Sequence, residues 1–322
     1  MAAILVDDLR KKFATRVPGQ GWSRYLFRPE FRETEALGGV TFTIEPGERV
    51  AFVGPNGAGK STTIKILSGI LFPTSGRVEV AGLVPWKDRR RLGYRIGTVF
   101  GQRSQLWYHL PAGDTFDLLA QIYDLSPADY RSRRAELTRA FEVERLLERP
   151  VRALSLGERM RCEIVASLLH RPEILFLDEP TIGLDVTAKA VIRDLVTERS
   201  RRDGTTILLT SHDTGDMEQV CDRVLVINTG RLLLDKPVQS LRMEFIRRKL
   251  ITLITAEPSV SIQIPGVRTV ESKPHRLVLE IDTTMVPVEK VVDAAMKASP
   301  LRDLTVEDPP MEEIVKEIYR GG

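Results

Sequence analysis

A glycine-rich segment early in the chain has the residue types that bind phosphate groups. It lies between an apolar run and a helical pattern and reads Gly54, Pro55, Asn56, Gly57, Ala58, Gly59, Lys60, Ser61 and Thr62. Glycines in such a loop let backbone N–H groups close around phosphate oxygens, and the following helix N-terminus adds positive potential. We expect Lys60 to reach the β- and γ-phosphates of a nucleotide and Ser61 to ligate magnesium. A plain glycine-rich turn is the alternative, but the flanking strand and helix favour phosphate binding.

Two adjacent carboxylates end an apolar run later in the chain. Residues 174–177 read Ile-Leu-Phe-Leu, and Asp178 and Glu179 follow them. Because the carboxyl ends of parallel strands meet at one edge of a sheet, we expect both side chains beside the phosphate loop. Asp178 suits the outer coordination sphere of magnesium, and Glu179 suits a general base or a group that orients water. Strand ends of this kind often only cap the next helix, so the assignment depends on the phosphate loop upstream.

The elements that must position these residues alternate between strand and helix. Residues 49–53 form a compact apolar strand, and a helical pattern covers about 60–69. Three more apolar strands are predicted at 174–177, 206–210 and 224–227, with helical or turn segments between them. This alternation indicates an α/β fold with a parallel sheet.

Between about 102 and 171 the pattern is helical. Ser126 offers an N-cap with Pro127 at the first helical position, and helical spacing is predicted again over 136–147. We interpret this stretch as a helical insertion into the α/β domain.

The two ends of the chain read differently. Residues 4–13 predict a short strand, 14–35 have no period and suggest an inserted loop, and 39–45 alternate as in a strand. Beyond about residue 241, strand-like runs at 250–254, 267–270 and 277–281 precede a helical run at 288–297. We therefore predict two domains, residues 1–240 and a small α+β domain of residues 241–322.

Composition limits the kinds of partner. The 322 residues carry a net charge of +3, and the basic residues alternate with acidic ones, which does not indicate nucleic acid binding. Cys162 and Cys221 lack metal-site spacing and are expected to be buried thiols in a reducing compartment. No apolar run approaches the roughly 18 residues that a membrane-spanning helix needs, so we expect any membrane role to require a partner.

With these motifs in place, the sequence resembles the ABC ATPase family over about residues 2–235. The phosphate loop is followed, in the order that the family has, by Gln102, by Leu154, Ser155, Leu156, Gly157 and Glu158, by Asp178 and Glu179, by Gly183, Leu184 and Asp185, and by His212. The resemblance implies a P-loop (RecA-like) core with antiparallel β and helical subdomains, the helical one at about 103–171. It also implies ATP hydrolysis with magnesium, in a homodimer that sandwiches each ATP between the phosphate loop of one subunit and the signature loop of the other.

The same resemblance implies roles for residues outside the phosphate loop. Ser155 and Gly157 would present a hydroxyl and backbone amides to the γ-phosphate held by the partner subunit, which agrees with the physics of helix N-termini. Gln102 would sense magnesium and the attacking water. His212 would contact the γ-phosphate and Glu179, although a lone histidine after a strand is usually a surface residue.

The resemblance implies two further roles, one at the dimer interface and one at the adenine ring of the nucleotide. Asp185 would bridge the dimer interface. Phe13 stands where the family has an aromatic residue that stacks on adenine, with Tyr25 as the competitor and simple packing of Phe13 as the alternative.

The signature loop departs from the common Leu-Ser-Gly-Gly-Gln, since Leu156 replaces a glycine and Glu158 replaces the glutamine. Leucine disfavours positive φ, so this backbone position must suit an ordinary residue. The strings 154–161 and 101–107 are similar to one exporter branch, the viologen or multidrug export ATPases of type 2 ABC exporters. That likeness implies an ATPase subunit on the cytoplasmic face of the cell membrane, energising export through separate permease subunits.

Two aromatic segments are candidates for contact with the permeases. Residues Gln105–Pro111 follow the glutamine loop, where the family receives the permease, and ordinary core packing of Trp107 is the alternative. Residues 22–32 interleave aromatics with arginines, and we hypothesise that they touch the permease near the membrane, the alternative being a solvated flap.

Other functions explain the motifs less well. A soluble ABC ATPase acting on nucleic acid or ribosomes would usually carry two cassettes or a long coiled-coil insertion, and the sequence has neither. A GTPase would need an Asn-Lys-x-Asp motif, which is absent. The C-terminal domain has no residues that suggest chemistry, and we expect it to stabilise the dimer or to regulate it.

Overall fold

The structure is a computed structural model that describes residues 1–16, 31–101, 104–211, 213–241, 248–307 and 318. The chain divides into two compact units, Met1–Lys236 and Pro237–Gly322. Within the described residues, no helix is long and apolar enough to cross a membrane. Cys162 and Cys221 are both buried free thiols, as expected.

The first unit is built around a six-stranded sheet with the strand order β5-β6-β7-β3-β8-β9. The pairs that join β5 to β6, β6 to β7, β7 to β3 and β3 to β8 are all parallel. The inner strands are buried on both faces, which explains their nearly continuous apolar sequences. The six strands are β3 (Arg49–Val53), β5 (Ile96–Phe100), β6 (Ile174–Asp178), β7 (Thr206–Ser211), β8 (Arg223–Asn228) and β9 (Arg231–Pro237).

A second, antiparallel sheet has the order β2-β1-β4. Its strands are β1 (Ile4–Arg16), β2 (Phe31–Ile44) and β4 (Ser75–Val80). The predicted loop over 14–35 is wrong at both ends, because β1 and β2 stay paired as far as Arg16 and Phe31. The outer parts of these strands are exposed and charged, so they lack the apolar alternation that marks a strand.

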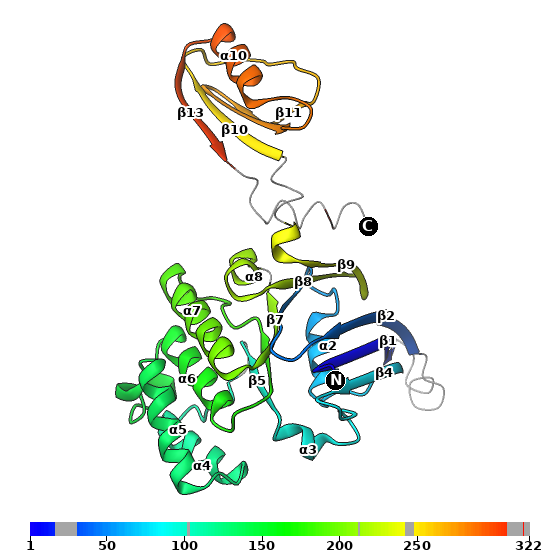
Figure 1. Ribbon diagram of the computed structural model, residues 1–322, viewed down its shortest axis with the longest axis vertical. Helices are drawn as coiled ribbons and strands as arrows, with labels where there is room; N and C mark the ends of the chain where they lie inside the picture. The colour runs from blue at the N-terminus through cyan, green and yellow to red at the C-terminus, as the bar shows by residue number, and fades with distance from the viewer. Residues whose placement is uncertain (17–30, 102–103, 212, 242–247, 308–317, 319–322) are drawn as a thin grey trace, which may run out of the picture. The chain divides into compact units, whose positions relative to one another are not determined.

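Helices cover the faces of the six-stranded sheet. Figure 1 shows α4, α5, α6 and α7 together on one side of it, with the three-stranded sheet and α2 on the other side. The helices are α2 (Lys60–Leu67), α3 (Arg89–Gly93), α4 (Ala112–Ile122), α5 (Pro127–Ala140), α6 (Leu156–Leu168), α7 (Val186–Asp203) and α8 (Thr214–Val220), with short 3-10 turns η1 (Glu144–Leu146) and η2 (Val151–Ala153).

The predicted helix over 136–147 is correct only as far as Ala140. Helix α5 begins as expected, with Ser126 as N-cap and Pro127 at the first position, but it ends at Ala140. Phe141 is fully buried there, and Glu142 adopts a left-handed φ of 53°, which breaks the helical path before η1.

The second unit contains a four-stranded antiparallel sheet of order β11-β12-β10-β13 and the helix α10. It has its own apolar core, which includes Ile251, Leu279 and Val291. Its elements are β10 (Arg248–Thr255), β11 (Val267–Lys273), β12 (Arg276–Asp282), α10 (Val288–Ala298) and β13 (Leu301–Glu307).

Candidate functional site

A cavity of about 790 Å³ lies at the carboxyl ends of β3 and β6. Eight of the predicted site residues line it, together with five residues that the sequence did not single out for this role, Ala36, Lys65, Phe100, Gly101 and Ile182. The predicted residues at its wall are Asn56, Gly57, Gly59, Lys60, Ser61, Thr62, Asp178 and Glu179. The structure thus brings the phosphate loop and the two carboxylates to one site.

The phosphate loop places Lys60 at the start of α2. Gly59 precedes it with φ of 108°, and a Cβ there would lie 2.8 Å from the carbonyl oxygen of Ala36. Only glycine fits this position. Lys60 is 5% exposed, and its Nζ donates to the carbonyl oxygens of Gly54 (2.7 Å) and Pro55 (3.2 Å). Burial lowers the pKa of Lys60, and the nearby carboxylates of Glu179 and Asp178 oppose that shift.

Gly54 and Ala58 support the loop from below. Both are buried, and a Cβ on Gly54 would lie 2.4 Å from the carbonyl oxygen of Ile227 in β8. Gly54 and Ala58 therefore lie against the sheet and do not line the cavity. Their small size lets the phosphate loop lie directly on the sheet.

Asp178 is held by two hydroxyl groups. Its Oδ1 accepts from Ser61 Oγ at 3.1 Å and from Thr210 Oγ1 at 2.5 Å. Thr210 comes from the neighbouring strand β7 and was not predicted as a site residue. A threonine within a strand pattern gives no signal of its own, since β-branched residues are common in strands.

Glu179 sits in a constrained backbone position. Its φ is 55°, and its backbone N–H donates to Thr210, to the carbonyl oxygen at 3.0 Å and to Oγ1 at 3.2 Å. Gly101, at the end of β5, lies against its carbonyl group, and a Cβ on Gly101 would be 2.1 Å from that oxygen. The close approach explains a glycine directly before Gln102.

The oxygen donors at the cavity fit magnesium. Magnesium is usually held by one or two carboxylates together with substrate phosphates, and less often by an all-protein cage. Ser61 and Asp178 supply such oxygens 3.1 Å apart. In the described part of the chain, no group of three or more His, Cys, Asp or Glu side chains could hold a metal by itself. Magnesium at this site would therefore depend on the phosphates of the nucleotide.

A buried carboxylate that contacts the loop after Glu179 was also missed by the sequence analysis. Asp216 is fully buried in α8, and one of its oxygens accepts from Thr181 (2.5 Å) and Ser211 (2.6 Å). Its other oxygen accepts from Arg193 Nε of α7 at 2.6 Å. This carboxylate joins the loop after Glu179 to the end of β7.

The predicted signature residues lie at the start of α6, away from the cavity wall. Ser155 caps the helix: its Oγ accepts from the backbone N–H of Glu158 (3.2 Å), while Glu158 Oε2 accepts from the N–H of Ser155 (2.8 Å). The hydrogen bond from the Ser155 backbone is the main cause of a lowered pKa at Glu158. Leu156 is the first helical residue, so this position suits an ordinary side chain, and Glu158 completes a capping box.

The starts of α6 and α7 are adjacent. Asp185 is exposed and caps α7, accepting from the N–H of Ala188 at 2.8 Å. A Cβ on Gly157 would lie 3.2 Å from Cβ of Ala188. Two helix N-termini, each a favourable place for an anion, are therefore neighbours.

Of the predicted residues not yet discussed at this site, only Phe13 lies within the described part of the chain. Phe13 is 39% exposed on β1, with Lys11 Nζ 5.0 Å from its ring centroid, and it is not among the residues that line the cavity. Gln102, His212 and the competitor Tyr25 lie outside the described residues.

The segment Gln105–Pro111 presents an apolar surface. Trp107, Tyr108 and Leu110 are 45%, 54% and 40% exposed, which rules out ordinary core packing of Trp107. Backbone hydrogen bonds from Arg152 to Tyr108 (2.9 Å) and from Val151 to Leu110 (3.0 Å) fix the segment.

The sequence matches a family model described as "ABC transporter" over residues 37–182. It is 30% identical over 290 residues to the daunorubicin resistance ATP-binding protein DrrA3 of Streptomyces coeruleorubidus, covering 88% of this chain and 91% of that protein. It is 34% identical to the Nod factor export ATP-binding protein I of Ralstonia nicotianae, covering 66% of this chain and 67% of that protein.

Solved structures show the same likeness. CbiO1 of Clostridium perfringens, described as part of the transporter complex cbiONQ, matches with a TM-score of 0.63 and 29% identity, over 76% of this chain and 91% of that chain. The dimeric ATP-binding cassette MJ0796 with ADP and Pi matches with a TM-score of 0.61 and 25% identity, over 73% and 98%. The predicted fold class, a P-loop ABC ATPase core, is confirmed.

Proposed function

Because the chain belongs to the ABC transporter ATP-binding protein family and is an ATPase, we propose that it energises export through separate membrane permease subunits. The observation that carries the proposal is the cavity that gathers the phosphate loop, Asp178 and Glu179 at the carboxyl edge of the sheet. The Nod factor export protein among its relatives supports export as the direction. The proposed location is the cytoplasmic face of the cell membrane.

In the proposed mechanism the chain positions charges and performs little covalent chemistry of its own. Lys60, now bonded to the carbonyl oxygens of Gly54 and Pro55, would exchange these for the β- and γ-phosphate oxygens. Glu179 would orient the attacking water and accept its proton, with the site held by hydrogen bonds from its backbone to Thr210. Gln102 and His212 are proposed to contact the water and the γ-phosphate.

Ser61 and Asp178 would hold magnesium, which supplies positive charge that neutralises the phosphate oxygens. The chain's own contribution is to fix these two side chains. Thr210 donates to Asp178, and this hydrogen bond holds the carboxylate with one oxygen toward Ser61.

A homodimer would complete the site. Ser155 and Gly157 lie at the start of α6, outside the cavity of their own subunit, and a hydroxyl and backbone amides at a helix start are suited to a γ-phosphate held by a second subunit. Asp185 would lie at the same interface, and the dimeric cassette MJ0796 among the similar structures supports the arrangement. Phe13 is proposed to stack on adenine.

The exposed side chains of Trp107, Tyr108 and Leu110 are proposed as the permease docking surface. We further propose that residues 1–240 form the ATPase domain, with a helical subdomain at about 103–171. Residues 241–322 would stabilise the dimer or regulate it.

The test is the variant Glu179→Gln, measured for ATP binding, ATP hydrolysis and oligomeric state. We expect ATP affinity within about twofold of the unchanged chain and hydrolysis lowered by at least about 100-fold, since proton acceptance by the carboxylate is lost. Sizing in ATP should then show a stable dimer.

The matched control is Glu173→Gln, at the opposite end of the same strand. Glu173 is paired with Arg95 at 2.6 Å and lies outside the cavity wall, so hydrolysis should stay unchanged. Normal turnover by Glu179→Gln would refute the assignment of Glu179.

A further inference from the structure

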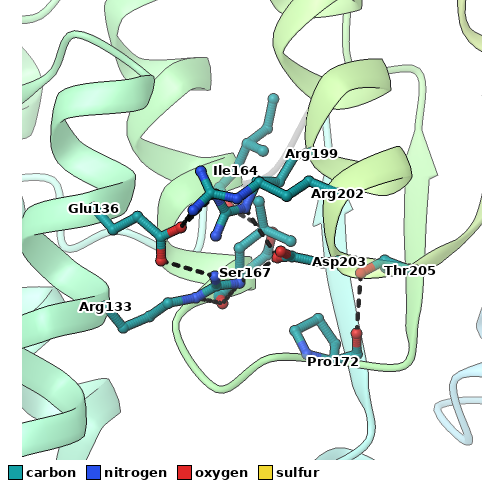
Figure 2. Close-up of polar contacts among 10 residues, drawn as sticks. Arg133, Glu136, Ile164, Ser167, Pro172, Arg199, Arg202, Asp203 and Thr205 are labelled. Atoms are coloured by element: carbon teal, nitrogen blue, oxygen red, sulfur yellow. Dashed lines mark hydrogen bonds and ion pairs between the residues drawn. The ribbon is translucent and has the colours of Figure 1, made fainter.

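A cluster of ion pairs joins the far end of α6 to α5 and α7. Figure 2 shows Arg133 and Glu136 of α5 facing Arg199, Arg202 and Asp203 of α7. Arg133 Nε and Nη2 each donate to the carbonyl oxygen of Leu168, the last residue of α6, at 3.3 Å. The same guanidinium contacts Glu136 at 3.2 Å and Asp203 at 2.8 Å.

The cluster is closely coupled. Arg199 contacts Glu136 and Asp203, each at 2.9 Å, so both carboxylates are shared with Arg133. Arg133 and Arg199 are only 5% and 4% exposed. Because a buried charge without its partner is strongly unfavourable, removing either arginine or either carboxylate disturbs the whole cluster.

The balance of charges in the cluster explains why the C-terminal end of α6 takes part in it. Three arginines, counting Arg202 at the rim 2.8 Å from Glu136, meet two carboxylates. The C-terminal end of a helix carries a partial negative charge on its last carbonyl groups. The Leu168 carbonyl therefore provides the additional negative potential that Arg133 faces.

Helix α6 connects this cluster to the proposed signature loop. Its 13 residues place the Ser155 cap about 20 Å from Leu168. At its first turn α6 touches α7, where Gly157 approaches Ala188. At its last residue it is bonded to Arg133, which is paired with α7. A short helix is rigid, so the cluster sets the direction in which Ser155 and Gly157 point.

We propose that this ion cluster positions α6 so that Ser155 and Gly157 reach the nucleotide held by a second copy of the chain. The inference rests on the proposed ATP-sandwich dimer. Arg133 is a positioning residue and touches no substrate. None of the residues in the cluster lines the nucleotide cavity. Its loss should therefore affect dimer formation and leave ATP binding to the subunit's own phosphate loop unchanged.

The experiment uses the full chain carrying Glu179→Gln, with and without Arg133→Gln. We expect the dissociation constant of the ATP-dependent dimer, measured by analytical ultracentrifugation, to rise at least about tenfold, as for the loss of one charged hydrogen bond. Binding of a fluorescent ATP analogue to the monomer should change less than about twofold. In a chain that carries Arg133→Gln and keeps Glu179, the ATP concentration for half-maximal hydrolysis should rise, because the dimer forms less readily.

Arg134→Gln is the matched control. Arg134 is the next residue of α5 and also forms an ion pair, at 2.7 Å with Asp117, but it has no contact with Leu168. The chain that carries both Arg134→Gln and Glu179→Gln should dimerise like the parent chain that carries Glu179→Gln alone. If Arg133→Gln fails to fold, Asp203→Asn, whose carboxylate is partly exposed, tests the same contact.

Three outcomes would overturn the inference or its basis. Dimerisation of both Arg133→Gln and Asp203→Asn equal to that of the Arg134 control would overturn the positioning role. A loss of ATP binding to the monomer as large as the loss of dimerisation would mean that the cluster is only structural. A Glu179→Gln parent that never dimerises would instead refute the proposed sandwich, and this inference with it.

Discussion

The hydroxyl of Thr210 contacts both Asp178 and Glu179 at the carboxyl edge of the six-stranded sheet. It donates to Asp178 at 2.5 Å and accepts from the backbone N–H of Glu179 at 3.2 Å, so one atom orients both carboxylate residues. Its loss would leave Asp178 able to rotate away from Ser61. Misplacement of catalytic groups by an ångström is sufficient to slow a reaction strongly.

We therefore predict that Thr210→Val lowers kcat for ATP hydrolysis by about 10- to 100-fold, with ATP affinity nearly unchanged. Thr210→Ser keeps the hydroxyl and should restore most of the activity. Steady-state ATPase kinetics beside equilibrium ATP binding would check both. A Thr210→Val chain with wild-type kcat would show that the hydroxyl has no positioning role.

At the scale of single residues, the sequence predicts those whose spacing is unusual and misses those whose type is ordinary. The phosphate loop, Asp178 and Glu179 were predicted because glycines, a lysine and paired carboxylates at strand ends are rare combinations. Thr210 and Asp216 were missed, since a threonine in a strand and an aspartate in a helix are common. Their roles depend on neighbours that are distant in sequence, such as Ser61 and Arg193.

Among the elements, four buried strands of the six-stranded sheet were predicted closely, whereas β5, which is also largely buried, and some exposed elements were missed or misjudged. The strands β3, β6, β7 and β8 are apolar along their length, and the sequence predicts each of them within two residues at either end. Strand β13 was missed, because none of its residues is fully buried and charged residues interrupt it. Helix α5 was predicted to end too late, since no glycine or proline marks the left-handed turn at Glu142.

The stabilisation that the ion pairs between α5 and α7 provide should depend on pH. Hydrogen bonds from Arg199 and Arg133 hold the pKa of Glu136 at about 2, below its ordinary value of 4.5. The folded state thus binds this proton less readily than the unfolded chain does. The resulting stabilisation is complete above about pH 4.5 and is lost as the pH falls towards about 2.

We predict that Glu136→Gln lowers the free energy of unfolding by about 1–3 kcal/mol at neutral pH. The difference from the unchanged chain should shrink as the solution is acidified through that window, in urea denaturation at a series of pH values. Glu144→Gln is the control, because Glu144 is mostly exposed and its cation, Arg139, lies 4.0 Å away. A difference independent of pH would contradict the assigned ion pairs.

For the whole molecule, the two compact units have separate apolar cores. Ile251 is fully buried in the core of the second unit, and Val224 is fully buried in β8 of the first. A truncation in one core should therefore leave the other unit folded.

We predict two transitions in calorimetry, of which only one rises when ATP is added, because a ligand stabilises the unit that binds it. Ile251→Ala should lower the unfolding free energy of the transition that ATP does not shift by about 2–5 kcal/mol. Val224→Ala should lower the other one. A single transition shifted by both substitutions would show that the units unfold together.

Helix α7 is bonded on two sides, at Arg193 to Asp216 and at Arg199 to Glu136. Each residue of an α-helix turns the next by about 100°, so one inserted residue between these arginines would rotate one contact out of phase with the other. The length of this segment is therefore constrained more strictly than its composition. In redesigned or diverged chains, substitutions on its solvent face should be tolerated, whereas single insertions or deletions between residues 193 and 199 should not.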